Sequence, residues 1–393
     1  MTRREETRPA PANIEQLLAA KEIVFTCGSG GVGKTTTAAA LGAMAATRLG
    51  GKVLVLTVDP ARRLADAMGL EAIGNVETPI TRETFAAAGV EPRGELWAAM
   101  LDMKQSWDDL VRRHAPNRET AERILDNALY TNITARFSQS HDYVAMERLY
   151  EIHASGRYDL VIVDTPPSRN AIDFLDAPAR MADFFGSRLL RWLTVPYRSR
   201  VINLASRPFY QVADRILGTQ FLQDIGEFFT LMRTMERGFV ERSRAVSKVL
   251  ADRRTTFVVV TTLESAPVRE AEFFIAALAD RKLHLGALVL NKVLPPSFTD
   301  RAAGRAADYL LREGGGELAS RLATVVKARP EQVTRVLTEV ARSFQNFEVV
   351  AKREAEQRAE LAVAPDVTVA VPYLDADVHD LAGLLTLGDR LWD

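Results

Sequence analysis

The sequence predicts an α/β fold, in which a mainly parallel sheet of about seven or eight strands is flanked by helices and carries a helical insert. Short apolar runs of strand length recur along the chain, and segments of helical pattern separate them. Several of these runs end in a carboxylate or amide residue, and a glycine-rich loop follows the first of them. Strands joined by helices run parallel, because a parallel connection needs a long crossover segment.

Composition limits the possible functions. Hydrophobic residues make up 47% of the 393 positions, enough for a full core, and the net charge is −1. A nearly neutral chain lacks the basic field that drives nonspecific nucleic-acid binding, so we expect no nucleic-acid partner. The longest run without a charged residue, 35–47, is about 13 residues, against the ~20 that a membrane-spanning helix needs. We expect a cytoplasmic location, with peripheral contact at a membrane left open.

The first strand-like run, residues 23–27, leads into the loop GSGGVGKT at residues 28–35. The loop satisfies the pattern G-x-x-x-x-G-K-[ST], and an alanine-rich helix follows it. In this pattern backbone N–H groups surround phosphate oxygens, Lys34 reaches the β- and γ-phosphates, and the Thr35 hydroxyl holds Mg²⁺. We predict a site for nucleotide phosphates at a helix N-terminus. Its binding residues are Gly28, Ser29, Gly30, Gly31, Val32, Gly33, Lys34, Thr35 and Thr36.

Two further strands end in aspartates that can serve phosphoryl transfer. The run 53–58 ends at Asp59, which is placed to orient an attacking water, although an Asp-Pro turn alone also explains it. The run 160–163 ends at Asp164, and two prolines then take the chain out of the sheet in a loop that can sense a γ-phosphate. We predict Asp59 and Lys34 as catalytic residues, and Thr35, Asp59 and Asp164 as contacts to Mg²⁺.

Later strands complete the predicted sheet. One begins at Thr255, and the next ends in Asn291 and Lys292. Side chains at such strand ends lie on the ligand-binding rim of an open α/β sheet, where the amide of Asn291 can pair with a base edge. A last short strand brings Pro372 to the same rim.

These segments resemble those of the arsenite-pump and tail-anchored-protein-targeting ATPases, a family of P-loop NTPases with a deviant Walker A motif. The resemblance rests on GGVGKTT, VDPARRLADAMG, TTFVVVTTLES and LVLNKV and on residues 140–178. It runs from about Glu22 to the C-terminus and is greatest for a bacterial subgroup labelled anion-transporter ATPases, like that of mycobacteria. It implies an enzyme that binds ATP and Mg²⁺ and hydrolyses ATP to ADP and phosphate.

The resemblance also implies roles for single residues. Asp59 resembles the family's water-activating aspartate in switch I, and Asp164 resembles the Walker B aspartate that opens switch II. Asn291 would contact adenine, and Pro372 would lie in the adenine-side loop. The chain would then be a conformational switch driven by ATP hydrolysis. It would act either as a chaperone for hydrophobic clients or, alternatively, as a regulatory or motor subunit of a hetero-oligomeric ATPase or membrane complex.

The sequence departs from the family pattern at Ser29. The family often has a lysine there that reaches across a dimer to the partner's nucleotide, and a serine supplies no cation. A homodimer and a heteromer with a lysine-bearing paralogous ATPase both stay open, and Arg62 and Arg63 are the nearest replacement cations. The single cysteine, Cys27, excludes both a zinc clamp built on a CxxC motif and a cluster of thiolates for arsenite.

Residues 181–240 hold seven of the chain's 17 phenylalanines, within a predicted helical insert of about residues 181–250. Residues 186–213 add five arginines and no acid. An exposed surface of this kind could hold a hydrophobic peptide client or contact a membrane-complex partner. A helical layer that packs its own aromatic side chains explains the composition equally well. The phenylalanines are Phe184, Phe185, Phe209, Phe221, Phe228, Phe229 and Phe239.

The two ends of the chain complete the predicted organisation. Residues 1–18 mix both charge signs with prolines and predict a disordered tail before a single P-loop ATPase domain at residues 19–393. Residues 330–361 predict one long amphipathic helix. The last stretch has apolar residues at helical spacing and a mostly acidic polar face, which favours a docked terminal helix over a membrane-binding tail.

Overall fold

The computed structural model describes residues 11–58, 62–68, 70, 74–127, 129–131, 138–186, 219–313, 315–361 and 365–392. They contain an eight-stranded sheet in the order β3-β4-β2-β5-β1-β6-β7-β8. Neighbouring strands are parallel except β3 and β4, so the predicted mainly parallel α/β fold is confirmed. The strands are β1 (Ile23–Cys27), β2 (Lys52–Thr57), β3 (Thr78–Pro79), β4 (Glu95–Met100), β5 (Leu160–Asp164), β6 (Thr255–Thr261), β7 (Leu285–Val293) and β8 (Val367–Pro372).

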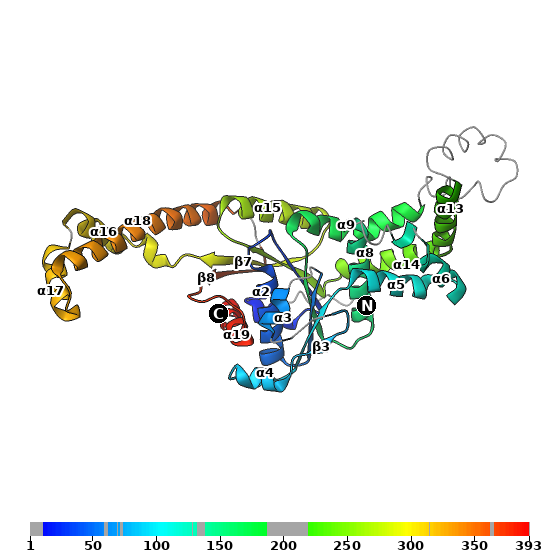
Figure 1. Ribbon diagram of the computed structural model, residues 1–393, viewed down its shortest axis with the longest axis horizontal. Coiled ribbons are helices and arrows are strands. Elements are labelled where there is room, and N and C mark those ends of the chain that lie inside the picture. The colour runs from blue at the N-terminus through cyan, green and yellow to red at the C-terminus, as the bar shows by residue number, and fades with distance from the viewer. Residues whose placement is uncertain are drawn as a thin grey trace, which may run out of the picture.

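The sheet separates two apolar layers, because successive side chains of a strand point to opposite faces. Val24 of β1 joins one layer, and Phe25 joins the other, where its ring stacks on Phe257 of β6 with 4.9 Å between ring centroids. Helices cover both layers (Figure 1). The first is covered by α1 (Ile14–Ala19), α2 (Lys34–Met44), α3 (Arg62–Ala67), α4 (Arg82–Ala87) and α19 (Leu381–Trp392), and the second by α8 (Ser138–Ala154), α9 (Ser168–Gly186), α14 (Glu236–Leu250) and α15 (Ser265–Asp280).

The folded body begins earlier than the sequence suggested. Helix α1 starts after Asn13, whose side-chain oxygen accepts a hydrogen bond from the backbone N–H of Gln16 at 3.0 Å. Its apolar residues Ile14, Leu17 and Leu18 are all buried in the first layer. The prediction of a disordered tail through residue 18 is therefore wrong for residues 14–18, because these apolar residues lie on one face of a helix and pack against the core.

A group of helices extends the second layer at one end of the sheet (Figure 1). It consists of α5 (Met103–His114), α6 (Arg118–Leu125) and α13 (Thr219–Thr234), together with parts of α8, α9 and α14, and it has an apolar core of its own. We call these six helices the helical group. The predicted insert thus packs with helices from residues 103–154, which no local signal in the sequence indicated.

The described phenylalanines of the predicted insert pack inward. Phe228 and Phe239 are 4% and 0% exposed, and Phe229 is half-buried against the same core. Outside the described residues lie the basic stretch 187–213 with Phe209, and the side chains of Phe184, Phe185 and Phe221.

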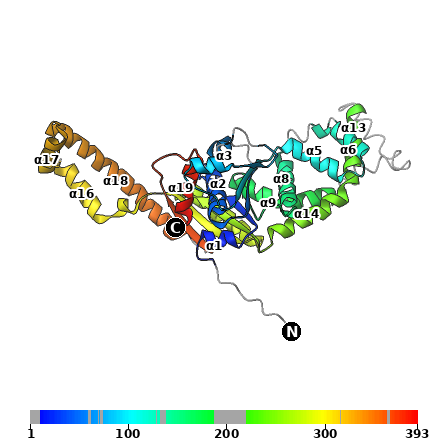
Figure 2. The same ribbon diagram turned by 90° about the horizontal axis from the view of Figure 1, so that it is seen from below.

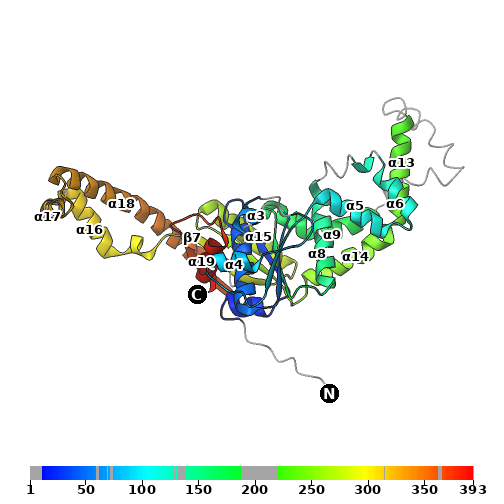
Figure 3. The same cartoon turned by 60° about the horizontal axis from the view of Figure 1, so that its bottom comes forward.

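A helical arm projects from the opposite end of the sheet (Figures 1, 2 and 3). After β7 the chain runs outward through the short helix η2 (Pro296–Thr299) and α16 (Arg301–Glu313), turns through α17 (Gly316–Val326) and returns along α18 (Pro330–Glu360). The long helix predicted at residues 330–361 is confirmed, but the sequence did not indicate that it would project from the body. No described helix combines the length and the hydropathy needed to cross a membrane.

The C-terminal helix α19 is docked, as the sequence predicted. Leu384 is fully buried in the first layer, and Gly388 lies so close to α2 that a Cβ atom there would be 2.2 Å from the Met44 side chain. The end of the chain therefore supports the same helix that follows the glycine-rich loop.

We expect Leu384→Ala to lower the free energy of unfolding by about 2–5 kcal/mol, because it removes buried methyl groups and leaves a cavity between α19 and α2. Thr386 is exposed on the same helix, and Thr386→Ala serves as the control. It should change the free energy of unfolding by less than about 0.5 kcal/mol. Denaturant titration measures both. Equal midpoints for the two variants would contradict the docking of α19.

Candidate nucleotide site

The glycine-rich loop lies at the carboxyl end of β1, in the middle of the sheet and directly before α2. A Cβ atom at Gly28 would be 2.1 Å from the carbonyl oxygen of Val260 on β6, so only glycine permits this approach. Gly33 has φ of +97° and precedes the first residue of α2, a conformation that also favours glycine. The helix N-terminus therefore faces the rim where phosphate oxygens would be held.

The polar side chains predicted to hold phosphate and metal lie at this rim. The Lys34 ammonium donates to the carbonyl oxygen of Ser29 at 3.0 Å and so lies across the loop. The Thr35 hydroxyl donates to Oδ2 of Asp164 at 2.7 Å, and the Thr57 hydroxyl donates to the same oxygen at 3.1 Å. Asp164 is 1% exposed. A hydroxyl and a carboxylate in contact are the hard oxygen ligands that suit Mg²⁺, so these residues fit the metal predicted from the sequence.

Asn291 connects the loop to β7. Its side-chain amide donates to the carbonyl oxygen of Val32 at 2.7 Å, and its side-chain oxygen accepts from the backbone N–H of Lys292 at 2.9 Å. A Cβ atom at Gly33 would be 2.4 Å from the same amide nitrogen. The base contact predicted for Asn291 stays a prediction, and the structure adds a second role, in which this side chain holds the glycine loop in place.

A cavity of about 570 Å³ opens beside the loop, within the size range of small-molecule sites. It brings together the loop, the ends of β7 and β8, and the segment that leads to α19. Asn291 and Pro372 both line it, and their contact with a base stays a prediction. Sequence reasoning missed the lining residues that directly follow Pro372 in PYLDADVHD: Tyr373, Leu374, Ala376, Asp377, Val378 and His379.

The remaining site predictions have different outcomes. Asp59 lies outside the described residues, as do the side chains of Arg62 and Arg63, so their roles stay predictions. Ser29 is 8% exposed, and its hydroxyl has no hydrogen-bond partner among the described residues. Gly30 and Gly31 are at the exposed crest of the loop, whereas Val32 is buried beneath it and Thr36 lines the cavity.

We expect Asn291→Ala to weaken binding of ATP and of inorganic tripolyphosphate by a similar factor of about tenfold, because a buried carbonyl left unpaired costs about 1–3 kcal/mol. Lys292→Ala is the control, since its backbone N–H keeps the bond to Asn291. Calorimetric titration measures both ligands. Loss of ATP binding with unchanged tripolyphosphate binding would show a base contact alone and contradict the role in holding the loop.

The chain is similar to known ATPases over most of its length. A family model described as an anion-transporting ATPase matches residues 21–307. The chain is 26% identical over 294 residues to an ATPase of Entamoeba dispar named as an ASNA1 homolog, which covers 72% of this chain and 81% of the relative. It is 24% identical over 290 residues to the ATPase get3 of Schizosaccharomyces pombe, with 73% and 78% covered.

A bacterial relative is the Streptomyces coelicolor protein SCO2128, which is 30% identical over 269 residues, with 68% of this chain and 61% of the relative covered. The family match includes the glycine loop, Asp164 and Asn291, the residues that the structure gathers at one rim. The chain is therefore a member of the anion-transporting ATPase family, and the reaction that it catalyses is ATP hydrolysis.

Proposed function

We propose that the chain is a magnesium-dependent switch, in which ATP binding and hydrolysis alter contacts with another protein. The hydrogen bond between Thr35 and Asp164 carries this proposal, because it joins the first turn of the phosphate-binding helix to the end of β5. Mg²⁺ bound there would neutralise phosphate charge, with Thr35 and Asp164 as its contacts and Lys34 on the β- and γ-phosphates. Asp59 would orient the attacking water.

The route from nucleotide to partner would pass through α9. This helix begins four residues after Asp164, packs against α8, α14 and α15, and reaches the helical group. Arg281, directly after α15, holds it through two hydrogen bonds to Asp176, at 2.8 and 2.7 Å, and these bonds keep the pKa of Asp176 below its usual value. A change in the loop after Asp164 would therefore move a helix whose far part belongs to the helical group.

We expect Lys34→Ala to abolish ATP turnover, because it removes the cation on the phosphates, and Asp164→Asn to lower it by about 100-fold or more, because it weakens the hold on Mg²⁺. Added Mg²⁺ should partly restore Asp164→Asn, since that variant weakens the metal site. Phosphate release at several Mg²⁺ concentrations measures this, with the exposed Lys52→Ala as the control. Normal turnover by Lys34→Ala would refute the site.

The partner is proposed to be a second ATPase subunit, identical or paralogous. Ser29 supplies no cation at the position where a lysine would reach another subunit's nucleotide, and its hydroxyl is buried within the loop. The described phenylalanines of the helical group pack into its core and do not line an open client groove. This packing favours a role as an ATPase subunit over a role as a client carrier. A hydrophobic client remains the second candidate for residues 181–240.

Arsenite is not proposed as a ligand. Burial raises the pKa of the Cys27 thiol to about 12, so the single cysteine is protonated at neutral pH and is 1% exposed. Among the described residues no group of three or more His, Cys, Asp or Glu side chains could hold a metal ion.

If a cation from another subunit limits turnover, Ser29→Lys should raise the rate of the isolated chain by about tenfold or more, because a cation at the γ-phosphate stabilises the transition state. Ser29→Ala is the matched control and should stay slow. Turnover measured over a range of protein concentrations tests both. Equal rates for the two variants would show that the missing lysine is not what limits this chain.

A further inference from the structure

The arm carries most of the exposed apolar side chains in the part of the chain that the structure describes. Nine of the twelve large hydrophobic residues that are exposed there lie on α16, α17 and α18. Isolated apolar residues are normal on a protein surface, but a cluster of this size marks a contact with another molecule. The nine are Tyr309, Leu318, Val325, Val326, Val336, Val340, Phe347, Val349 and Val350.

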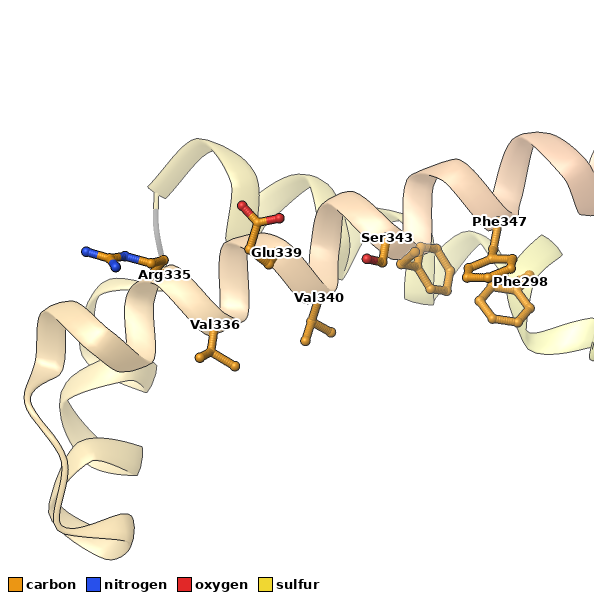
Figure 4. A pocket seen from close by; sticks show the side chains of 8 residues that line it. Phe298, Arg335, Val336, Glu339, Val340, Ser343 and Phe347 are labelled. Carbon is orange, nitrogen blue, oxygen red and sulfur yellow. The ribbon is translucent and has the colours of Figure 1, made fainter. Parts of the chain in front are cut away.

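Helix α18 has two apolar faces, of which the arm itself covers one. Ala341 is buried where α18 packs against α16, whereas Val336 and Val340 are 60% and 57% exposed on another face. Beside them lies a groove of about 540 Å³, in which Phe298 of η2 approaches Phe347 with 5.2 Å between ring centroids. Figure 4 shows Val336 and Val340 pointing to the same side of α18, with the Phe298 ring against Phe347.

The exposed face follows the spacing of a coiled-coil seam. Along α18 it contains the half-buried Val333 and the exposed Val336, Val340, Ser343, Phe347 and Val350, separated alternately by three and four residues. The order of these intervals is the same from either end of the helix. When a second α18 is placed antiparallel on the first, each seam residue therefore lies opposite a seam residue of the second copy. Val336 then lies opposite Phe347 of the second copy, Val340 opposite Ser343, and Val333 opposite Val350. A surface that complements itself in this way suits a two-fold contact.

The charges beside the seam agree with the same register. Glu339 falls opposite Asn346 of the second copy, and Gln332 falls opposite Arg353, so no like charges face each other along this edge. Arg342 pairs with Glu339 of its own chain at 2.6 Å, which offsets the charge of Glu339 at this edge. Because acids and bases alternate here, the edge fits another copy better than a uniformly anionic membrane surface.

We propose that two copies of this chain associate through α18 in this antiparallel register. The two α16–α18 hairpins would form a four-helix bundle, whose core is the seam of each copy and the groove beside it. Helix α18 has 31 residues, or a length of ~47 Å, of which the seam at residues 333–350 spans ~27 Å. The contact lies apart from the nucleotide rim and goes beyond the proposed switch, because it needs no nucleotide.

Single cysteine variants of the full chain test this contact without nucleotide. Ser343→Cys lies on the seam near the two-fold axis, and Ser320→Cys lies on α17 outside it; both serines are exposed. The native Cys27 is buried and stays unreactive. With a short bismaleimide, Ser343→Cys should yield about tenfold more covalent dimer than Ser320→Cys, because association raises the local thiol concentration.

Two further variants make the result decisive. Val340→Arg in the Ser343→Cys chain should abolish the cross-link, while the circular dichroism of the chain stays unchanged, since Val340 is exposed in the single chain. Lys34→Ala in the Ser343→Cys chain should leave the yield of cross-linked dimer unchanged. A failure of the arm contact is therefore distinguishable from a failure of the nucleotide site.

The proposal is overturned if Ser343→Cys cross-links no more than Ser320→Cys. It is also overturned if the chain sediments as a monomer while the arm binds an apolar helical peptide or vesicles of phosphatidylserine and phosphatidylcholine.

Discussion

The nucleotide rim depends on how closely the glycine loop approaches β6 and β7, the two strands that follow β1 on one side of the sheet. At Gly28 the limit is the carbonyl oxygen of Val260, and at Gly33 it is the amide of Asn291, each too near to admit a Cβ atom. Neighbouring strands therefore hold the loop, whose own sequence is highly flexible. With the loop held in this way, its N–H groups and the N-terminus of α2 need little reorganisation to receive a phosphate.

The carboxylate of Asp164 adds a second constraint. It is buried at the end of β5, and a buried carboxylate needs partners, which Thr35 and Thr57 provide. These hydrogen bonds connect α2, β2 and β5 at one point. The same aspartate is followed by the loop to α9, which continues into the helical group. One short piece of chain therefore joins the glycine-loop rim to the helical group.

The arm differs from the body in how much of its apolar surface is covered. The family model matches residues 21–307, so α17 and α18 lie beyond the matched part. The body buries its apolar residues in layers on both sides of the sheet, whereas α18 leaves a second apolar face uncovered. An apolar face that remains exposed in one chain is most readily explained by a contact with another chain. The proposed pairing of arms would be separate from the hydrolytic site.

The sequence determined the features that depend on neighbouring residues. The spacing of glycines before Lys34 predicted the phosphate loop, the apolar runs predicted the parallel sheet, and the long amphipathic pattern predicted α18. Each of these signals is local, because strand, helix and turn preferences act over a few residues. Proline and charge content also suggested a tail through residue 18, but three apolar residues were enough to bury α1.

Only the tertiary structure decided which distant segments meet. Asn291 donates to Val32 across 259 positions of the chain, the helices of residues 103–154 join those of the predicted insert, and Tyr373 and His379 complete the cavity. It also decided that α18 projects from the body and leaves one apolar face uncovered. Such contacts leave no local pattern, because they depend on how strands order themselves and on which faces remain to be covered once the sheet has formed.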